Sequence, residues 1–204
     1  MSTLWFVRHG RTAWNDQRRV QGNTSVGLTS EGRKQIKSLL PLIKGWGPQA
    51  LYSSPLARAT ESAQIIADAV SLTVTKLPNL IELDVGDWLG KTEDELRVFK
   101  SWMTYQRNPT LAAPPHGESI RHLSKRVVSA IDKLLESKQG KVLIVSHGDV
   151  IRAAICHYVG IPLSHIHNFR VGLGSLSVVS WHDNTASLLK LNHSGQWREE
   201  EADG

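Results

Sequence analysis

Two histidines of this chain stand where α/β proteins commonly carry out chemistry. Residues 4–7 are apolar and are followed by Arg8 and His9, and the apolar residues 142–145 are followed after one serine by His147. Such unbroken apolar runs are typical of strands buried on both faces, as in parallel sheets covered by helices. Because ligands of open α/β sheets bind at the carboxyl ends of the strands, we expect the two histidines to converge on one site.

A cation is predicted at the start of a helix over residues 55–70. Ser54 at the N-cap and Pro55 at the first helical position predict this start, because proline lacks an amide hydrogen that would be unsatisfied there anyway. Arg58 then lies in the first turn, where the exposed amides and the helix dipole already favour anions. The residue types alone leave Arg58 open as a surface residue or as part of an anion site.

A loop over residues 80–88 supplies candidate acids. It holds Glu82, Asp84 and Asp87. Glu82 lies between apolar neighbours, and burial there would raise its pKa toward the value that a general acid requires. We interpret Asp84 and Asp87 as structural or surface residues.

Taken together, the motifs of this chain resemble those of the histidine phosphatase superfamily, also called the phosphoglycerate mutase-like family. The resemblance covers nearly the whole chain and rests on five motifs in order. They are Arg8-His9-Gly10 with Thr12 and Asn15; residues 53–60 (SSPLARAT); Glu82 with Gly86, Trp88 and Gly90; Gly117-Glu118-Ser119; and Val145-Ser146-His147-Gly148. The resemblance implies an α/β fold, a three-layer α/β/α sandwich with a mostly parallel central sheet, formed by a single domain over residues 1–204.

The activity that the resemblance implies is metal-independent phosphomonoester hydrolysis through a phosphohistidine. A neutral imidazole, here His9, brings no negative charge to the phosphate and forms a phosphoramidate that water can cleave. Arg8, Arg58 and His147 would supply positive charge to the phosphoryl oxygens. Glu82 would protonate the leaving alcohol and then deprotonate the attacking water.

Further residues are expected to bind substrate. Beside Arg8, Arg58 and His147, they are Asn15, Gln21, Gly22, His116 and Gly148. Glu118 could orient Arg8 or His9, or it could only favour a helix dipole. We expect residues 102–116 to determine specificity, and sugar phosphates, phosphoglycerate-type acids, phosphoserine and α-ribazole phosphate all stay open as substrates.

Two other functions fit parts of this pattern. A phosphoglycerate mutase would use the same core, but the chain is short for a mutase and no match to the basic insert or the long carboxy-terminal tail of mutases is found in it. A catalytically silent phospho-ligand binding module would be expected to have lost one of the residues His9, Arg58, Glu82 and His147, and all four are present. A phosphatase is therefore favoured.

The composition indicates a globular protein, and the resemblance implies a small-molecule phosphomonoester as its partner. The 204 residues are 40% hydrophobic, which suits one domain with a real core. Cys156 is the one cysteine, so no internal disulfide can form and a cytoplasmic setting is favoured. No apolar run approaches the ~20 residues of a membrane span, and we predict a monomer or homodimer.

The charged residues and the histidines argue against two other classes of ligand, nucleic acids and metal ions. The net charge is +5, but the basic residues are scattered and match no nucleic-acid recognition motif, so nucleic acid is not an expected partner. The nine histidines include no third ligand at recognisable metal spacing, so we predict no metal and no cofactor.

Periodicity and breaker residues predict the remaining elements. They are a loop over 11–28, a helix from Thr29 or Ser30 to Ile43 that Pro41 kinks or ends, strands at 50–53, 73–77 and 141–146, helices over 92–106, 118–137 and 149–159, a loop over 108–116, a hairpin of strands 174–181 and 186–192 joined at 183–184, and a frayed tail over 198–204.

Overall fold

The computed structural model describes residues 2–136, 140–182 and 185–194, and in them one sheet is formed. Its strand order is β3-β2-β4-β1-β5-β6. The strands are β1 (Ser2–Arg8), β2 (Ala50–Ser53), β3 (Val74–Lys76), β4 (Lys141–Ser146), β5 (Leu176–His182) and β6 (Thr185–His193). All pairings among β1, β2, β3 and β4 are parallel, and β5 is antiparallel to both of its neighbours. The predicted mostly parallel sheet is confirmed.

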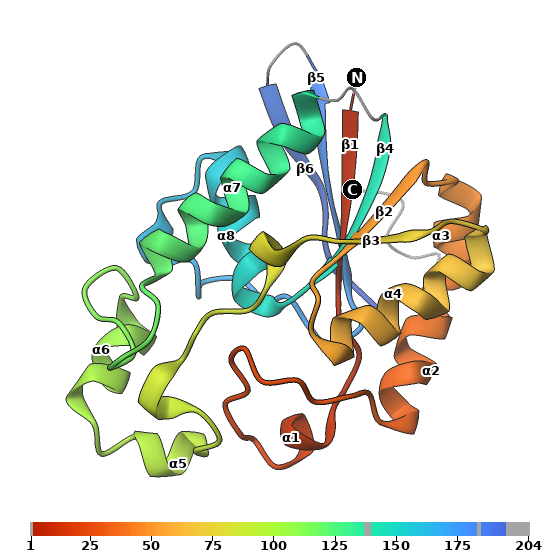
Figure 1. The fold of residues 1–204 in the computed structure, drawn as a ribbon. Helices are drawn as coiled ribbons and strands as arrows, with labels where there is room; N and C mark the ends of the chain where they lie inside the picture. The colour runs from red at the N-terminus through yellow and green to blue at the C-terminus, as the bar shows by residue number, and fades with distance from the viewer. Residues whose placement is uncertain (1, 137–139, 183–184, 195–204) are drawn as a thin grey trace, which may run out of the picture.

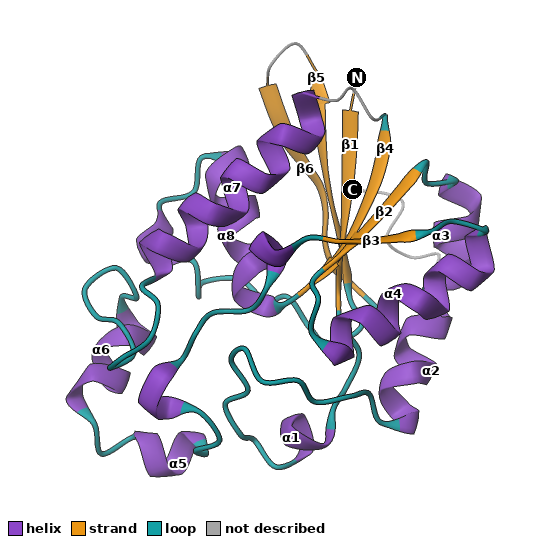
Figure 2. Cartoon of the chain, in the orientation of Figure 1, coloured by secondary structure: helices purple, strands orange, loops and turns teal. Residues whose placement is uncertain are grey.

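Helices cover both faces of the sheet (Figures 1 and 2). On one face lie α2 (Ser30–Ser38), α3 (Leu40–Trp46) and α4 (Ala57–Val70), and on the other lie α7 (Ile120–Glu136) and α8 (Gly148–Val159). Each face has its own hydrophobic core: Leu4 and Phe6 of β1 belong to one, and Trp5 and Val7 to the other. The apolar run in β1 is unbroken because its side chains alternate between two buried faces.

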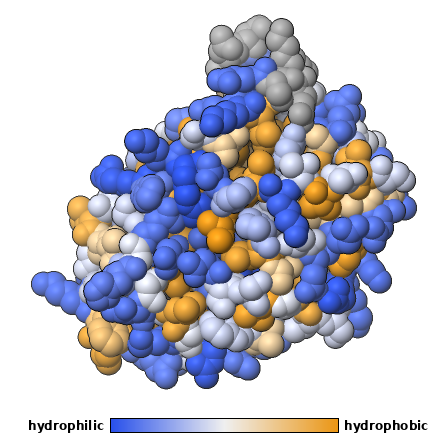
Figure 3. Space-filling model, viewed as in Figure 1, coloured by the Kyte–Doolittle hydropathy of each residue, from blue (hydrophilic) through white to orange (hydrophobic). Residues whose placement is uncertain are grey.

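Most of the remaining elements lie below and to the lower left of the sheet in Figure 1, beyond the carboxyl end of β1. The remaining elements are α1 (Ala13–Asp16), α5 (Glu93–Leu96), α6 (Lys100–Arg107) and the short 3₁₀ turns η1 (Pro78–Leu80) and η2 (Gly86–Trp88); a third, η3 (Leu163–His165), follows α8. Apolar side chains reach the surface at the lower left of Figure 3, over the α5–α6 region, which includes the exposed Val98 and Phe99.

The prediction of one helix over residues 92–106 is wrong. Thr92 begins α5 with a capping box, and the extended backbone of Phe99 (φ −92°, ψ 122°) separates α5 from α6. Phe99 and Met103 are 46% and 38% exposed, whereas Trp102 packs in the core as expected. The break turns the aromatic face of α6 inward while Phe99 stays at the surface.

Two predicted helix starts are also displaced. α4 begins after an N-cap at Leu56 and not at Pro55, and Leu56 has no side-chain cap of its own. The hydroxyl of Ser54 accepts a hydrogen bond from the Leu56 amide at 3.3 Å, so it supports the turn before the helix rather than its first turn. Similarly, α7 begins at Ile120 and leaves Glu118 in the preceding loop.

Most other boundaries agree with the prediction. Thr29 caps α2, and α8 ends before Gly160, which has a left-handed φ of 77°. The helix predicted to reach Ile43 breaks earlier than expected, at Leu39, so that Pro41 stands in the first turn of a second helix, α3, which runs to Trp46. The β5–β6 hairpin is confirmed at the sheet edge. The turn at 183–184, residues 137–139 and the tail at 198–204 lie outside the described residues. Within the described residues, the helices are all too short or too polar to cross a membrane.

Candidate active site

The structure brings His9 and His147 together at the carboxyl edge of the sheet. β1 and β4 are adjacent and parallel, with Arg8 paired to Ser146, so the two strand-end histidines follow side by side. Their ring centroids are 5.2 Å apart, and the two residues are 2% and 0% exposed.

The His9 ring is oriented with one nitrogen toward the site. Its Nδ1 lies 2.7 Å from the Gly10 carbonyl, which can only accept, so Nδ1 carries the proton and Nε2 keeps its lone pair. The backbone is fixed from both sides, since the His9 amide donates to Ser146 and its carbonyl accepts from Gly174. Burial, with the charges of two nearby arginines, holds the pKa of His9 well below its usual value. The imidazole is therefore neutral.

Gly10 is required by a close approach of the backbone. A Cβ atom there would lie 2.3 Å from the carbonyl oxygen of Gly32 in α2. Any side chain at residue 10 would push the end of β1 away from α2, and with it the His9 backbone.

Arg58 is a buried cation beside His9. Its Nε lies 3.2 Å from His9 Nε2, and its two terminal nitrogens donate to the carbonyls of Thr24 (2.6 Å) and Gly22 (2.7 Å). Burial lowers its pKa to about 10, which leaves it charged at neutral pH. The guanidinium thus orders the loop from β1 to α2 and directs Nε toward the imidazole.

Arg8 lies on the other side of the site. One terminal nitrogen donates to the Val171 carbonyl at 2.6 Å, while Nε is buried without a partner among the described residues. A Cβ at Gly148 would come within 3.3 Å of the Arg8 guanidinium carbon, so the glycine lets this cation lie against the start of α8. Burial lowers the pKa of Arg8.

His147, which is predicted to supply positive charge to a phosphate, carries none in the ligand-free protein. Burial, followed by the charge of Arg58, holds its pKa well below the usual value, so the ring is neutral in the free protein. Its Nε2 lies 2.7 Å from the Ser54 hydroxyl, and its buried Nδ1 has no partner in the described part of the chain. Ser54 is a site residue that the sequence prediction missed, because its position before Pro55 indicated a helix cap.

Glu82 has the environment expected of a general acid. Desolvation, and then the negative charge of Asp149, raise its pKa to about 7, against the opposing influence of Arg58. One carboxylate oxygen accepts a hydrogen bond from the Leu83 amide at 3.0 Å. The side chain is therefore poised to exchange a proton near neutral pH.

His9, Arg58, Arg8 and Glu82 surround one cavity, which we call the central pocket, of about 350 Å³; the predicted site residues His147 and Gly148 are not among its lining residues. Of the predicted residues, it is lined by Arg8, His9, Asn15, Gln21, Gly22, Arg58 and Glu82. It is also lined by Arg18, Arg19, Glu93 and Asp149, which were not predicted to bind substrate. The two arginines could have been found from the unusually long loop over 11–28, since such loops at strand ends are commonly functional.

Asn15 and Gln21 are both held by Thr12. The Asn15 side-chain oxygen accepts from the Thr12 amide at 3.0 Å, and the Gln21 side-chain oxygen accepts from the Thr12 hydroxyl at 3.0 Å. Because the oxygens are engaged, the amide nitrogens of both side chains are the groups that can donate to a ligand.

His116 and Glu118 lie elsewhere than the sequence suggested. His116 contacts Asp87, with Nδ1 3.1 Å from a carboxylate oxygen, and lines a separate hollow of about 400 Å³ on the far side of Glu82. Glu118 pairs with Arg126 rather than with Arg8 or His9. Neither residue lines the central pocket.

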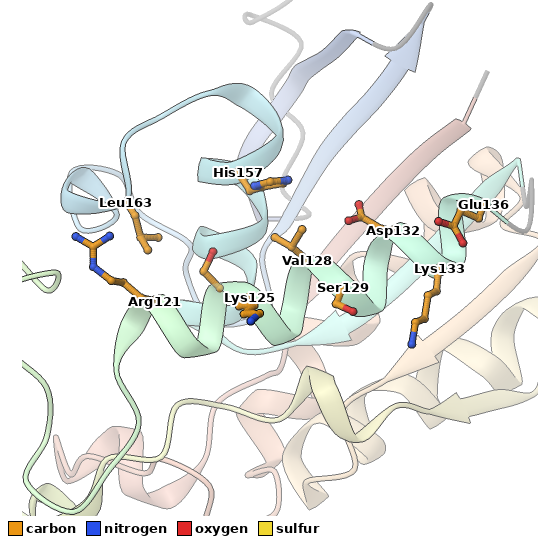
Figure 4. Close-up of a pocket in the computed structure, with 10 residues that line it drawn as sticks. Arg121, Lys125, Val128, Ser129, Asp132, Lys133, Glu136, His157 and Leu163 are labelled. Carbon is orange, nitrogen blue, oxygen red and sulfur yellow. The ribbon is translucent and has the colours of Figure 1, made fainter.

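A larger hollow of about 610 Å³ lies along α7, against α8 and η3 (Figure 4). Its walls carry charges of both signs, including Lys125, Lys133, Asp132 and Glu136. None of its lining residues has a buried polar atom without a partner in the described structure. The buried charged groups that converge on the central pocket therefore identify it, rather than this larger hollow, as the candidate active site.

Among the described residues, no three His, Cys, Asp or Glu side chains are grouped as metal ligands.

Comparison with known proteins identifies the family. The model of the histidine phosphatase superfamily (branch 1) matches residues 4–194. A probable phosphoglycerate mutase GpmB from Yersinia pestis (strain Pestoides F) is 34% identical over 187 residues, which cover 90% of this chain and 87% of the relative.

Two solved structures show the same fold. A mycobacterial glucosyl-3-phosphoglycerate phosphatase in complex with VO3 has a TM-score of 0.87 and 26% identity, covering 95% of this chain and 100% of the other. A phosphoserine phosphatase from Entamoeba histolytica in complex with 3-phosphoglyceric acid has a TM-score of 0.84 and 28% identity, covering 94% and 97%. The predicted three-layer α/β/α fold is confirmed.

Proposed function

Because this chain belongs to the histidine phosphatase superfamily, we propose that it hydrolyses small phosphomonoesters through a phosphohistidine on His9, in the cytoplasm and without a metal ion. The observation that carries the proposal is the neutral His9 ring, whose unprotonated Nε2 faces Arg58 Nε at 3.2 Å in a pocket that Arg8 also lines. The single buried Cys156 supports a reducing compartment.

In the first step, the lone pair of His9 Nε2 forms a bond to phosphorus while the bond from phosphorus to the leaving oxygen breaks. Arg8 and Arg58 stabilise the charge on the phosphoryl oxygens, and neutral N–H groups of His147 and Asn15 add hydrogen bonds. The Glu82 carboxyl group donates its proton to the leaving oxygen, so that an alcohol and not an alkoxide departs.

In the second step, water attacks the phosphorus of phospho-His9. Glu82, now a carboxylate, takes a proton from that water, and the bond between nitrogen and phosphorus breaks with its electron pair returning to Nε2. Inorganic phosphate leaves and Glu82 is protonated again. A pKa of about 7 suits a group that acts in turn as acid and as base.

The experiment that tests this proposal traps the intermediate. Wild-type protein quenched during turnover should carry acid-labile, base-stable phosphate, and His9→Ala should carry none and lose turnover. His157→Ala, which changes an exposed histidine of α8, is the matched control. Activity should survive EDTA. Near-normal activity of His9→Ala, or loss of wild-type activity in EDTA that a divalent ion restores, would contradict the proposal.

A phosphoglycerate mutase is the second candidate, and the name of the Yersinia relative favours it. A mutase must keep water from the phosphohistidine until an acceptor arrives, and the central pocket is bordered by the exposed Arg18 and Arg19. Incubation with 3-phosphoglycerate and a trace of 2,3-bisphosphoglycerate should therefore release phosphate, if it reacts at all. Rapid equilibration of the phosphoglycerate isomers would establish the mutase instead.

A further inference from the structure

A second cavity, which we call the side hollow, opens beside the central pocket. The two cavities share four lining residues: Val20, Val85, Glu93 and Asp149. The side hollow has a volume of about 330 Å³, within the range of small-molecule sites. Whatever is bonded to a phosphate in the central pocket can therefore extend past Asp149 into the side hollow.

Two buried hydrogen-bonding groups at the side hollow lack partners. The Tyr105 hydroxyl and the Nε of Arg152 are buried and have no hydrogen-bond partner in the described part of the chain. Both residues line the side hollow. A buried polar group without a partner destabilises the free protein, so such groups call for an explanation, and a bound ligand supplies one.

The Tyr105 ring is held rigidly. The residue is 4% exposed, and its ring makes edge contacts with Trp88 and His167 at centroid distances of 5.3 Å each. Burial and the charges of Asp149 and Glu82 raise the pKa of Tyr105 well above its usual value, so the hydroxyl keeps its proton. It offers a fixed donor in the wall of the side hollow.

The charges around the side hollow select against an acidic leaving group. Its one arginine, Arg152, is already paired with Asp149 at 2.8 Å, and Glu93 adds a second carboxylate. A carboxylate on the leaving group would meet more negative than positive charge there. An alcohol hydroxyl, by contrast, can donate to Asp149 and accept from Tyr105 or Arg152.

We propose, building on the function proposed above, that the side hollow binds the leaving alcohol and that the substrate is the phosphate of a neutral polyhydroxylated alcohol, such as a sugar or sugar alcohol. Tyr105 and Arg152 donate hydrogen bonds to its hydroxyl oxygens, and Asp149 accepts a hydrogen bond from one of its hydroxyl groups. Trp102, from the region expected to set specificity, lies in the same wall and offers an aromatic surface to the carbon chain.

The test compares three primary alkyl phosphates with six-carbon chains. Glucitol 6-phosphate carries neutral hydroxyls, 6-phosphogluconate adds a carboxylate, and n-hexyl phosphate has no further polar group; p-nitrophenyl phosphate reports phosphatase chemistry. We expect kcat/KM for glucitol 6-phosphate to exceed that of the other two alkyl phosphates at least tenfold. Equal or greater values for either would overturn the substrate class. No hydrolysis of any compound, including the aryl phosphate, would overturn the proposed function itself.

A pair of tyrosine variants tests the role of Tyr105. Tyr105→Phe should lower kcat/KM for glucitol 6-phosphate, relative to p-nitrophenyl phosphate, about three- to tenfold, mainly through KM. Tyr158→Phe is the matched control, because its hydroxyl bonds Asp132 at 2.8 Å and does not line the side hollow.

The thermal stability of the same variants separates binding from structure. Tyr105→Phe removes a hydroxyl without a partner and should keep or raise the melting temperature of the ligand-free protein. Tyr158→Phe breaks a hydrogen bond and should lower it. Tyr105 would not be a donor to the leaving alcohol if Tyr105→Phe left the ratio of kcat/KM for glucitol 6-phosphate to that for p-nitrophenyl phosphate unchanged. The same conclusion would follow if its melting temperature fell as much as that of Tyr158→Phe.

Discussion

Glu118 and Arg126 form a two-pronged ion pair, with distances of 2.7 Å from Oε1 to Nε and 2.7 Å from Oε2 to Nη2. The same guanidinium donates to the backbone carbonyls of Asn79 (2.8 Å), Ile81 (2.8 Å) and Glu82 (3.2 Å). Arg126 of α7 therefore holds the loop that carries Glu82 at three backbone carbonyls, and the ion pair with Glu118 keeps the Arg126 guanidinium in place.

We expect Arg126→Gln to release this loop without touching the substrate. Turnover of alkyl phosphates should fall on the order of 10-fold to 100-fold, because the acid is no longer held in position. Water that reaches Glu82 should also lower its pKa from about 7, because burial is what raises it. The basic limb of the pH–rate profile should therefore move to lower pH. Arg121→Gln, an exposed arginine of the same helix, is the control. An unshifted basic limb would show that Arg126 does not position Glu82.

Glu82→Gln should harm substrates according to how much their leaving group needs a proton. An alkyl phosphate must leave with its oxygen protonated, whereas p-nitrophenolate departs unaided. General acid catalysis is typically worth ~100- to 10,000-fold, so the burst rate should fall by about that factor for an alkyl phosphate and far less for p-nitrophenyl phosphate. Steady-state turnover can fall for both, because the attacking water also needs Glu82. Equal losses in the burst rate would direct attention to Asp84, tested by Asp84→Asn.

The same variant should change how stability depends on pH. The pKa of Glu82 is raised from 4.5 to about 7 on folding. The contribution of this raised pKa to the free energy of unfolding is therefore fully present below pH 4.5, declines as pH rises, and is lost above about pH 7. The free energy lost over this range is about 3 kcal/mol. Relative to wild type, Glu82→Gln should thus gain several degrees in melting temperature between pH 4 and pH 8. Asp68→Asn, which alters an exposed carboxylate of α4, serves for comparison. If the melting temperature of Glu82→Gln differs from that of wild type by the same amount at every pH, the carboxylate of Glu82 is not buried.

Ser54→Ala should weaken the site through His147. The hydroxyl lies 2.7 Å from His147 Nε2, and removing it leaves a second buried nitrogen of that ring without a partner. We expect kcat/KM to fall about tenfold and inorganic phosphate to inhibit less well. Ser53→Ala removes a neighbouring buried hydroxyl that donates to the Ser54 carbonyl at 2.9 Å instead. Equal effects of the two substitutions would mean that Ser54 acts only on the fold.

The central strands and the convergence of the histidines could be predicted because local sequence determines them. A run such as residues 4–7, apolar at every position, is typical of a strand covered on both sides, and β1 and β4 carry such runs. Once two such strands are parallel neighbours, the residues after them must meet. The pKa of Glu82 followed in the same way from its apolar neighbours.

What escaped prediction depends on contacts between distant segments. The ion pair of Glu118 and Arg126 serves carbonyls about 45 positions away in the chain, and no local pattern marks them. Ser54 resembles a helix cap in sequence, yet its hydroxyl is used by His147, 93 positions further on. The break at Phe99 falls where no glycine or proline marks it; Leu96 before it and Trp102 after it are both buried in the same core cluster.

The contact between Gly10 and Gly32 predicts what a random mutational screen of this protein would report. Gly32 has no functional group and lies in α2, yet a Cβ on it would come within 2.2 Å of the Arg11 carbonyl oxygen, next to the segment that carries His9. A screen that scores phosphate release alone would therefore rank Gly32 beside the reactive residues. A parallel measurement of protein abundance would distinguish the two kinds of variant, those at Gly32, which displace His9 by distorting the fold, and those at His9 itself, which remove the reactive ring.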